Sequence, residues 1–117
     1  TEYNISWAYF DYGYRQNQPL PPYPLSLIQG SSAYRDHYFN TSEFLNDLRN
    51  SNLPSVSLLM FTGGNGYDEH SALDLHLPFN LTQGQVNLAY FIDAVEDSPY
   101  WNSTVIFITF DEGGGFL

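Results

Sequence analysis

The chain has 117 residues, 3 basic and 13 acidic, and a formal net charge of −10 at pH 7. All three basic residues are arginines, so no basic patch exists to bind nucleic-acid phosphates or anionic lipid headgroups. A hydrophobic content of 43% and an absence of cysteine exclude a solvated disordered chain, a disulfide framework and a thiolate metal site.

The first forty residues are rich in tyrosine and proline. The run Ile5 to Phe10 allows a short strand, whereas the proline density from Pro19 to Pro24 forbids a helix or a central strand there. We therefore predict a single partial domain over residues 1–117. Residues 1–40 form an irregular excursion packed by its aromatic side chains, and residues 41–117 form a helix-strand-helix-strand unit.

The first helix and strand of that unit are expected between residues 41 and 61. Thr41 or Ser42 can cap a helix from Glu43 to Arg49, whose apolar side chains share one stripe. The apolar run from Val56 to Phe61 follows Pro54 and precedes a glycine pair, a pattern that predicts a buried strand.

The second helix and strand complete the unit. The segment from Thr82 to Asp97 predicts a long helix that is apolar on more than one side, and therefore largely buried, and that ends at Pro99. The segment from Val105 to Phe110 is β-branched and aromatic, which is typical of a central strand covered on both faces. No apolar run reaches the roughly 20 residues that cross a bilayer, and the N-terminus lacks a signal pattern, so we expect any targeting segment to lie outside this chain.

A strand, a helix and a second strand in this order form a βαβ unit, so the sequence predicts an α/β fold with a mostly parallel sheet. In open sheets of this kind, ligands bind outside the carboxyl ends of the strands. The segments expected there are residues 62–70 and 111–115, both of which are acidic and rich in glycine.

These two segments contain the candidate metal ligands. Asp111 and Glu112 directly follow the second strand, and His70 lies in the loop after the first. Carboxylate oxygens with an imidazole suit a divalent cation in a phosphate-handling site, but a solvated acidic turn explains the same residues. His37 and His76 have no second ligand type at a suitable spacing, which favours loop or packing roles for both.

Four Asn-x-Ser/Thr sequons occur in the chain, at Asn4, Asn40, Asn80 and Asn102. Any one of them is compatible with the ordinary abundance of Asn, Ser and Thr in loops. Four together, with strong acidity and no lysine, favour a glycosylated protein outside the cell or at its surface.

Several segments, in their order and spacing, resemble the C-terminal half of a known family. The family is the phosphoesterases, which include bacterial and archaeal phospholipases C and acid phosphatases within the alkaline-phosphatase-like superfamily. The residues that carry the resemblance are Ile5 to Phe10, Leu53 to Ser57, Asp68 to His70, Ser98 to Thr104, and Val105 to Phe116.

The resemblance implies an α/β/α sandwich and a metal-dependent hydrolase of phosphoesters with a hydroxyl nucleophile. It assigns metal binding to Asp111 and Glu112, contact with metal or phosphate to His70, and a place at the edge of the active site to Glu69. The family's nucleophile and its early acidic motif match no residue of this chain. The rest of the polypeptide is therefore expected to supply them, and the 117 residues alone are expected to be inactive.

Two functions from different classes remain at this point. The first is the C-terminal portion of an extracellular, metal-dependent phosphoesterase that acts on phosphomonoesters or phospholipids. The second is a non-catalytic surface glycoprotein that keeps the fold, because a fold by itself never guarantees activity.

Overall fold

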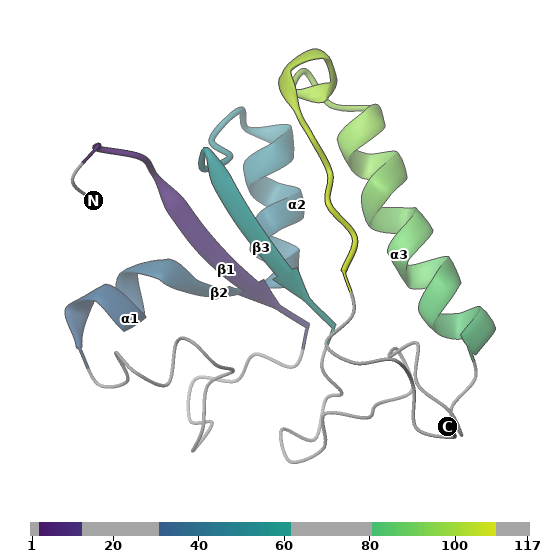
Figure 1. Cartoon of the computed structure of the whole chain (residues 1–117), viewed down its shortest axis with the longest axis horizontal. Helices are drawn as coiled ribbons and strands as arrows, with labels where there is room; N and C mark the ends of the chain where they lie inside the picture. Colours follow the sequence, from purple (N-terminus) through teal and green to yellow (C-terminus); the bar gives the residue numbers. More distant parts are fainter. Residues whose placement is uncertain (1–2, 13–30, 62–80, 110–117) are drawn as a thin grey trace.

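A computed structural model of the chain describes residues 3–12, 31–61 and 81–109, and confirms the predicted α/β class. Three parallel strands form a sheet, and the described helices alternate with them along the chain (Figure 1). The strands are β1 (Trp7–Asp11), β2 (Tyr38–Asn40) and β3 (Val56–Met60).

The central strand of the described sheet is β1, because the strand order is β2-β1-β3. Tyr9 pairs in register with Tyr38 of β2 and with Leu58 of β3. The sequence allowed only a short strand here, in a segment otherwise expected to be irregular. Its central position comes from pairing with two strands that lie far away in the sequence.

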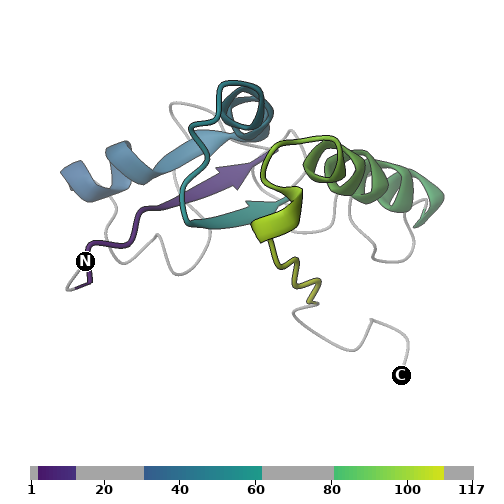
Figure 2. The same cartoon turned by 90° about the horizontal axis from the view of Figure 1, so that it is seen from above.

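One face of the sheet forms the hydrophobic core. Helices α2 (Thr41–Arg49) and α3 (Leu81–Glu96) both pack on this face, as Figure 2 shows. The buried core residues are Ala8 and Phe10 from the sheet, Phe44 and Leu48 from α2, and Phe91 and Val95 from α3. In each helix the two core residues are four positions apart, so both face the sheet.

Helix α2 confirms the predicted helix but begins at a different cap. Asn40, the last residue of β2, has an extended backbone, and its side chain accepts a hydrogen bond of 2.9 Å from the amide of Ser42. Thr41, one of the two predicted caps, is instead the first helical residue and is buried. Asn40 therefore ends a strand and caps a helix without an intervening loop.

Helix α3 confirms the second predicted helix, although only one side of it is well buried. Phe91 and Val95 are 6% exposed, whereas Val86 and Tyr90 are more than half exposed. Helix α1 (Ser32–His37) contacts β1 and leads directly into β2, and a short 3-10 helix, η2 (Trp101–Ser103), follows α3.

The strand expected from Val105 to Phe110 is not formed over its described residues, 105–109. A strand needs a neighbour for its backbone and cover for its faces. Val105 and Phe107 are instead 75% and 84% exposed, and Figure 2 shows the segment on the side away from α2 and α3. The expected burial of β3 is also only partial, because Val56 and Leu58 are nearly half exposed on the face opposite the core.

Candidate active site

The candidate site lies at the carboxyl edge of the sheet, where α/β proteins bind ligands. The three strands end there in register, at Asp11, Asn40 and Met60. In Figure 1 the strand arrowheads mark this edge, and α2 and α3 run back from it toward the opposite edge.

Asp11 is the charged group at this edge that the described structure buries, with 1% of its surface exposed. The hydroxyl of Tyr38 donates a hydrogen bond of 2.7 Å to Asp11 Oδ2, and Tyr38 is itself 2% exposed. Hydrogen bonds to a carboxylate are stronger than those between neutral groups, and a buried carboxylate requires them. Asp11 and Tyr38 thus form a buried carboxylate–phenol pair at the end of the central strand.

Tyr9 lies next to this pair on the same face of the sheet. Its ring packs edge-on against Tyr38 with centroids 6.1 Å apart, and its hydroxyl donates to the sulfur of Met60 over 3.3 Å. Burial, and secondarily the negative charge of Asp11, raises the pKa of Tyr9 to about 12. Tyr9 therefore stays neutral at physiological pH and serves as a packed hydrogen-bond donor rather than as a base.

The main chain of Tyr12 is held from both neighbouring strands just beyond Asp11. Its amide donates to the carbonyl of Met60 over 3.0 Å, and its carbonyl accepts a 3.3 Å hydrogen bond from Asn40 Nδ2. Asn40 thus caps α2 with its side-chain oxygen and holds Tyr12 with its side-chain nitrogen. These contacts tie the three strand ends together beyond the sheet ladder.

The predicted metal ligands His70, Asp111 and Glu112, and Glu69 beside them, lie outside the described residues. Across residues 3–12, 31–61 and 81–109, no three or more acidic or histidine side chains gather closely enough to hold a metal ion.

Of the two other histidines, His37 has the packing role that its sequence context favoured, and His76 lies outside the described residues. The ring of His37 stacks on Trp7 with centroids 4.0 Å apart, and its Nδ1 lies 2.8 Å from the Trp7 carbonyl oxygen. These contacts attach the end of α1 to the start of β1.

Sequence reasoning missed Asp11 and Tyr38 as site residues. Their local sequence gives little signal, because neither lies in a glycine-rich, acidic segment like those that contain the predicted metal ligands. The one available sign was a carboxylate that directly follows the run Ile5 to Phe10, the same placement that singled out Asp111 after its own apolar run.

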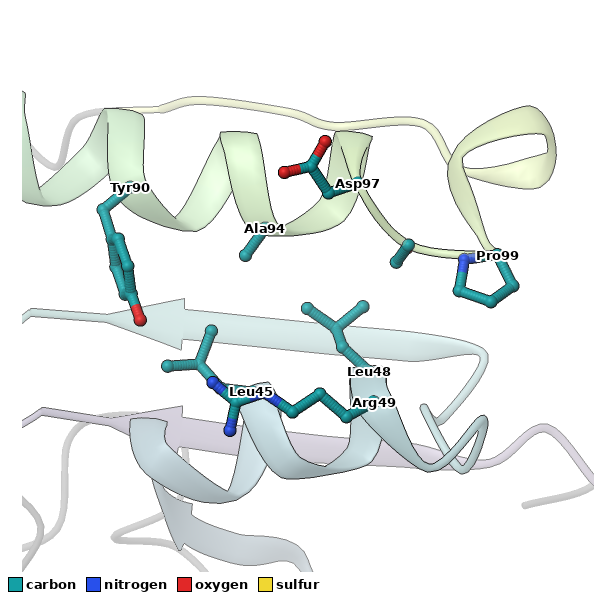
Figure 3. Close-up of a pocket in the computed structure, with 8 residues that line it drawn as sticks. Leu45, Leu48, Arg49, Tyr90, Ala94, Asp97 and Pro99 are labelled. Atoms are coloured by element: carbon teal, nitrogen blue, oxygen red, sulfur yellow. The ribbon is translucent and has the colours of Figure 1, made fainter.

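A groove of about 390 Å³ lies between α2 and α3 (Figure 3). Its lining comes from the C-terminal parts of both helices, so it extends toward the amino edge of the sheet, away from the candidate site. Of its polar groups, Arg49 and Asp97 are exposed, and the hydroxyl of Ser98 already donates to the carbonyl of Val95 over 2.7 Å. This arrangement offers no activated nucleophile.

Three of the four sequon asparagines lie within the described residues. Asn4 and Asn102 are exposed, the former with a positive φ of 54° and the latter within η2. Asn40 is half-buried and uses its side-chain amide in the contacts described above, and Asn80 lies outside the described residues.

Among the described helices, none is both long and apolar enough to cross a membrane.

Comparison with known proteins places this geometry in context. The model of the phosphoesterase family matches residues 2–117. Over 112 residues, the chain is 30% identical to non-specific phospholipase C6 of Arabidopsis thaliana. The match covers 91% of this chain but only 20% of that relative, so the chain spans about a fifth of its length. No solved structure matches the chain significantly.

Proposed function

This chain belongs to the phosphoesterase family, and we propose that it forms part of the catalytic domain of a metal-dependent hydrolase of phosphomonoesters or phospholipids. The family match over nearly the whole chain is the observation that carries this proposal. The similarity to a non-specific phospholipase C supports a phosphoester substrate. The parallel sheet, with its strand ends in register at one edge, is consistent with such a site.

The cation site that we propose consists of Asp111, Glu112 and His70, with Glu69 on the substrate side. Two carboxylates and an imidazole are ligands suited to a divalent cation. Such an ion stabilises the charge that develops on phosphoryl oxygens during hydrolysis.

The attacking hydroxyl belongs, in this proposal, to another part of the same polypeptide, which also covers the apolar surface left open here. That surface includes Val56 and Leu58 on β3 and the side chains of residues 105–108, which are between 39% and 84% exposed. A parallel sheet normally has both faces covered, and apolar surface of this extent marks an interface. The 117 residues by themselves should therefore be inactive.

Hydrolysis of p-nitrophenyl phosphate and of phosphatidylcholine by the intact polypeptide tests the function. We expect metal-dependent activity in the parent, a loss of about a hundredfold or more in Asp111→Asn, and little change in the control His76→Ala. Equal activity of Asp111→Asn and the parent would remove the metal role. An intact protein without any phosphoesterase activity would favour the non-catalytic surface glycoprotein instead.

An extracellular or cell-surface location is the final part of the proposal, and the four sequons support it. A glycan needs an accessible asparagine, which Asn4 and Asn102 provide. Mass spectrometry of the native protein should find added hexose at Asn4 or Asn102 and an unmodified Asn40. Unmodified asparagine at all four sequons would remove the support for export.

A further inference from the structure

We propose that Asp11 and Tyr38 are a positioning pair for the active site, a role that rests on the phosphoesterase function proposed above. The two residues meet at the carboxyl end of the central strand, the edge at which α/β enzymes bind their substrates. Neither residue belongs to the proposed metal site or to its substrate side.

The burial of Asp11 is the first reason for this assignment. A carboxylate that is 1% exposed has lost its hydration, and an apolar side chain of similar size would fill the same space without that cost. The neighbouring positions on this face of β1 are the aromatic residues Trp7 and Tyr9. The charged side chain of Asp11 is an exception to the aromatic pattern on this face of β1, and such exceptions concentrate at functional sites.

The contacts around the pair are the second reason. The hydrogen bond from Tyr38 links the last residue of β1 to the first residue of β2. One residue further on, the main chain of Tyr12 is bonded to Met60 of β3 and to the side chain of Asn40. The pair therefore lies where hydrogen bonds join the ends of β1, β2 and β3. The segments that follow β1 and β3 begin at the same place.

This arrangement gives the pair a defined task. Rigid supporting residues hold catalytic groups at their productive separation. A displacement of a catalytic group by about 1 Å lowers the rate by as much as a hundredfold. Asp11 and Tyr38 fix the relative position of the strand ends, so their loss should reduce turnover more than substrate binding. Tyr9 provides the matched comparison, because it is buried on the same face and also donates through a tyrosine hydroxyl, but to Met60.

The experiment compares Asp11→Asn, Tyr38→Phe, the double variant and the control Tyr9→Phe in the intact polypeptide, with p-nitrophenyl phosphate as substrate. Circular dichroism and thermal unfolding first establish the folded fraction of each variant.

We expect kcat to fall by about tenfold to a hundredfold in Asp11→Asn and Tyr38→Phe, with KM changed by less than about threefold. The double variant should be no slower than the slower single variant, because both changes remove one shared contact. Tyr9→Phe should keep kcat within about twofold of the parent.

Each contrary outcome has a distinct meaning. Full activity per folded molecule in both single variants, or losses that multiply in the double variant, would overturn the positioning role. An equal loss of kcat in Tyr9→Phe, or failure of both single variants to fold, would assign the pair a purely structural role and overturn it as well. An intact parent with no phosphoesterase activity would overturn the proposed function and this role together, whereas an active parent with unaffected variants overturns this role alone.

Discussion

Replacing Phe10 with alanine should destabilise the 117-residue chain far more than the same replacement at Phe107. Phe10 is fully buried, and its ring centroid lies 5.4 Å from that of Phe44 and 6.0 Å from that of Phe39. Its removal forfeits the burial of an aromatic ring and these ring contacts and leaves a cavity, a loss of about 3 to 5 kcal/mol. Phe107 is 84% exposed, so its replacement should change the free energy of unfolding by less than about 0.5 kcal/mol.

Urea unfolding followed by circular dichroism measures both changes. With a denaturant slope of about 2 kcal/mol per molar, the Phe10→Ala midpoint should fall by roughly 2 M, and the Phe107→Ala midpoint should stay close to that of the parent. Equal and large losses would show that residues 105–109 belong to the core of the isolated chain. Equal and small losses would refute the assignment of the core to the face that carries Phe10. In the intact polypeptide, a large loss for Phe107→Ala would show that another segment covers it.

Three further predictions concern single residues. Ser51 follows the C-cap of α2 with a φ of 54°, so Ser51→Gly should raise the free energy of unfolding by about 0.5 to 1 kcal/mol in urea unfolding, and a destabilised variant would contradict this. Asn40→Ala should cost about 1 kcal/mol or more in the same assay because the N-cap is lost, whereas Asn40→Asp keeps an acceptor for Ser42 and should cost less; equal losses would exclude the cap as the cause. Tyr9 should titrate near pH 12 by ultraviolet absorbance. Because unfolded tyrosine loses its proton near pH 10, this contribution to stability is complete below pH 10 and is lost as the pH rises through about 12; a Tyr9→Phe variant with the same alkaline decline would contradict that reasoning.

The helices α2 and α3 and the strand β3 could be predicted from the sequence because their information is local. A stripe of apolar side chains four residues apart identifies a helix, and a short apolar run between proline and glycine identifies a strand. The buried core residues of both helices have this four-residue spacing: Phe44 and Leu48 in α2, and Phe91 and Val95 in α3. The α/β class was predicted correctly, but the expected pairing of residues 56–61 with residues 105–110 was wrong over the described residues, because β3 pairs with β1 and residues 105–109 form no strand.

The strand expected at residues 105–110 shows the limit of local information. Its composition favours a central strand, but a strand forms only where a neighbour completes its backbone hydrogen bonds and other elements cover its faces. Over residues 105–109 the structure supplies neither, and four apolar side chains remain exposed. The composition of a segment gives its propensity to form a strand, but the strand forms only when other parts of the fold pair with it and cover it.

The sequence by itself determined the fold class and the family, because both depend on residue types in a fixed order. The tertiary structure alone decided that β1 is central, that Asn40 both caps α2 and holds Tyr12, and that Asp11 is buried against Tyr38. The hydrogen bond from Tyr38 to Asp11 and the one from Asn40 to Tyr12 join residues 27 and 28 positions apart in the chain. No local pattern encodes such contacts, because strand pairing in space brings the residues together.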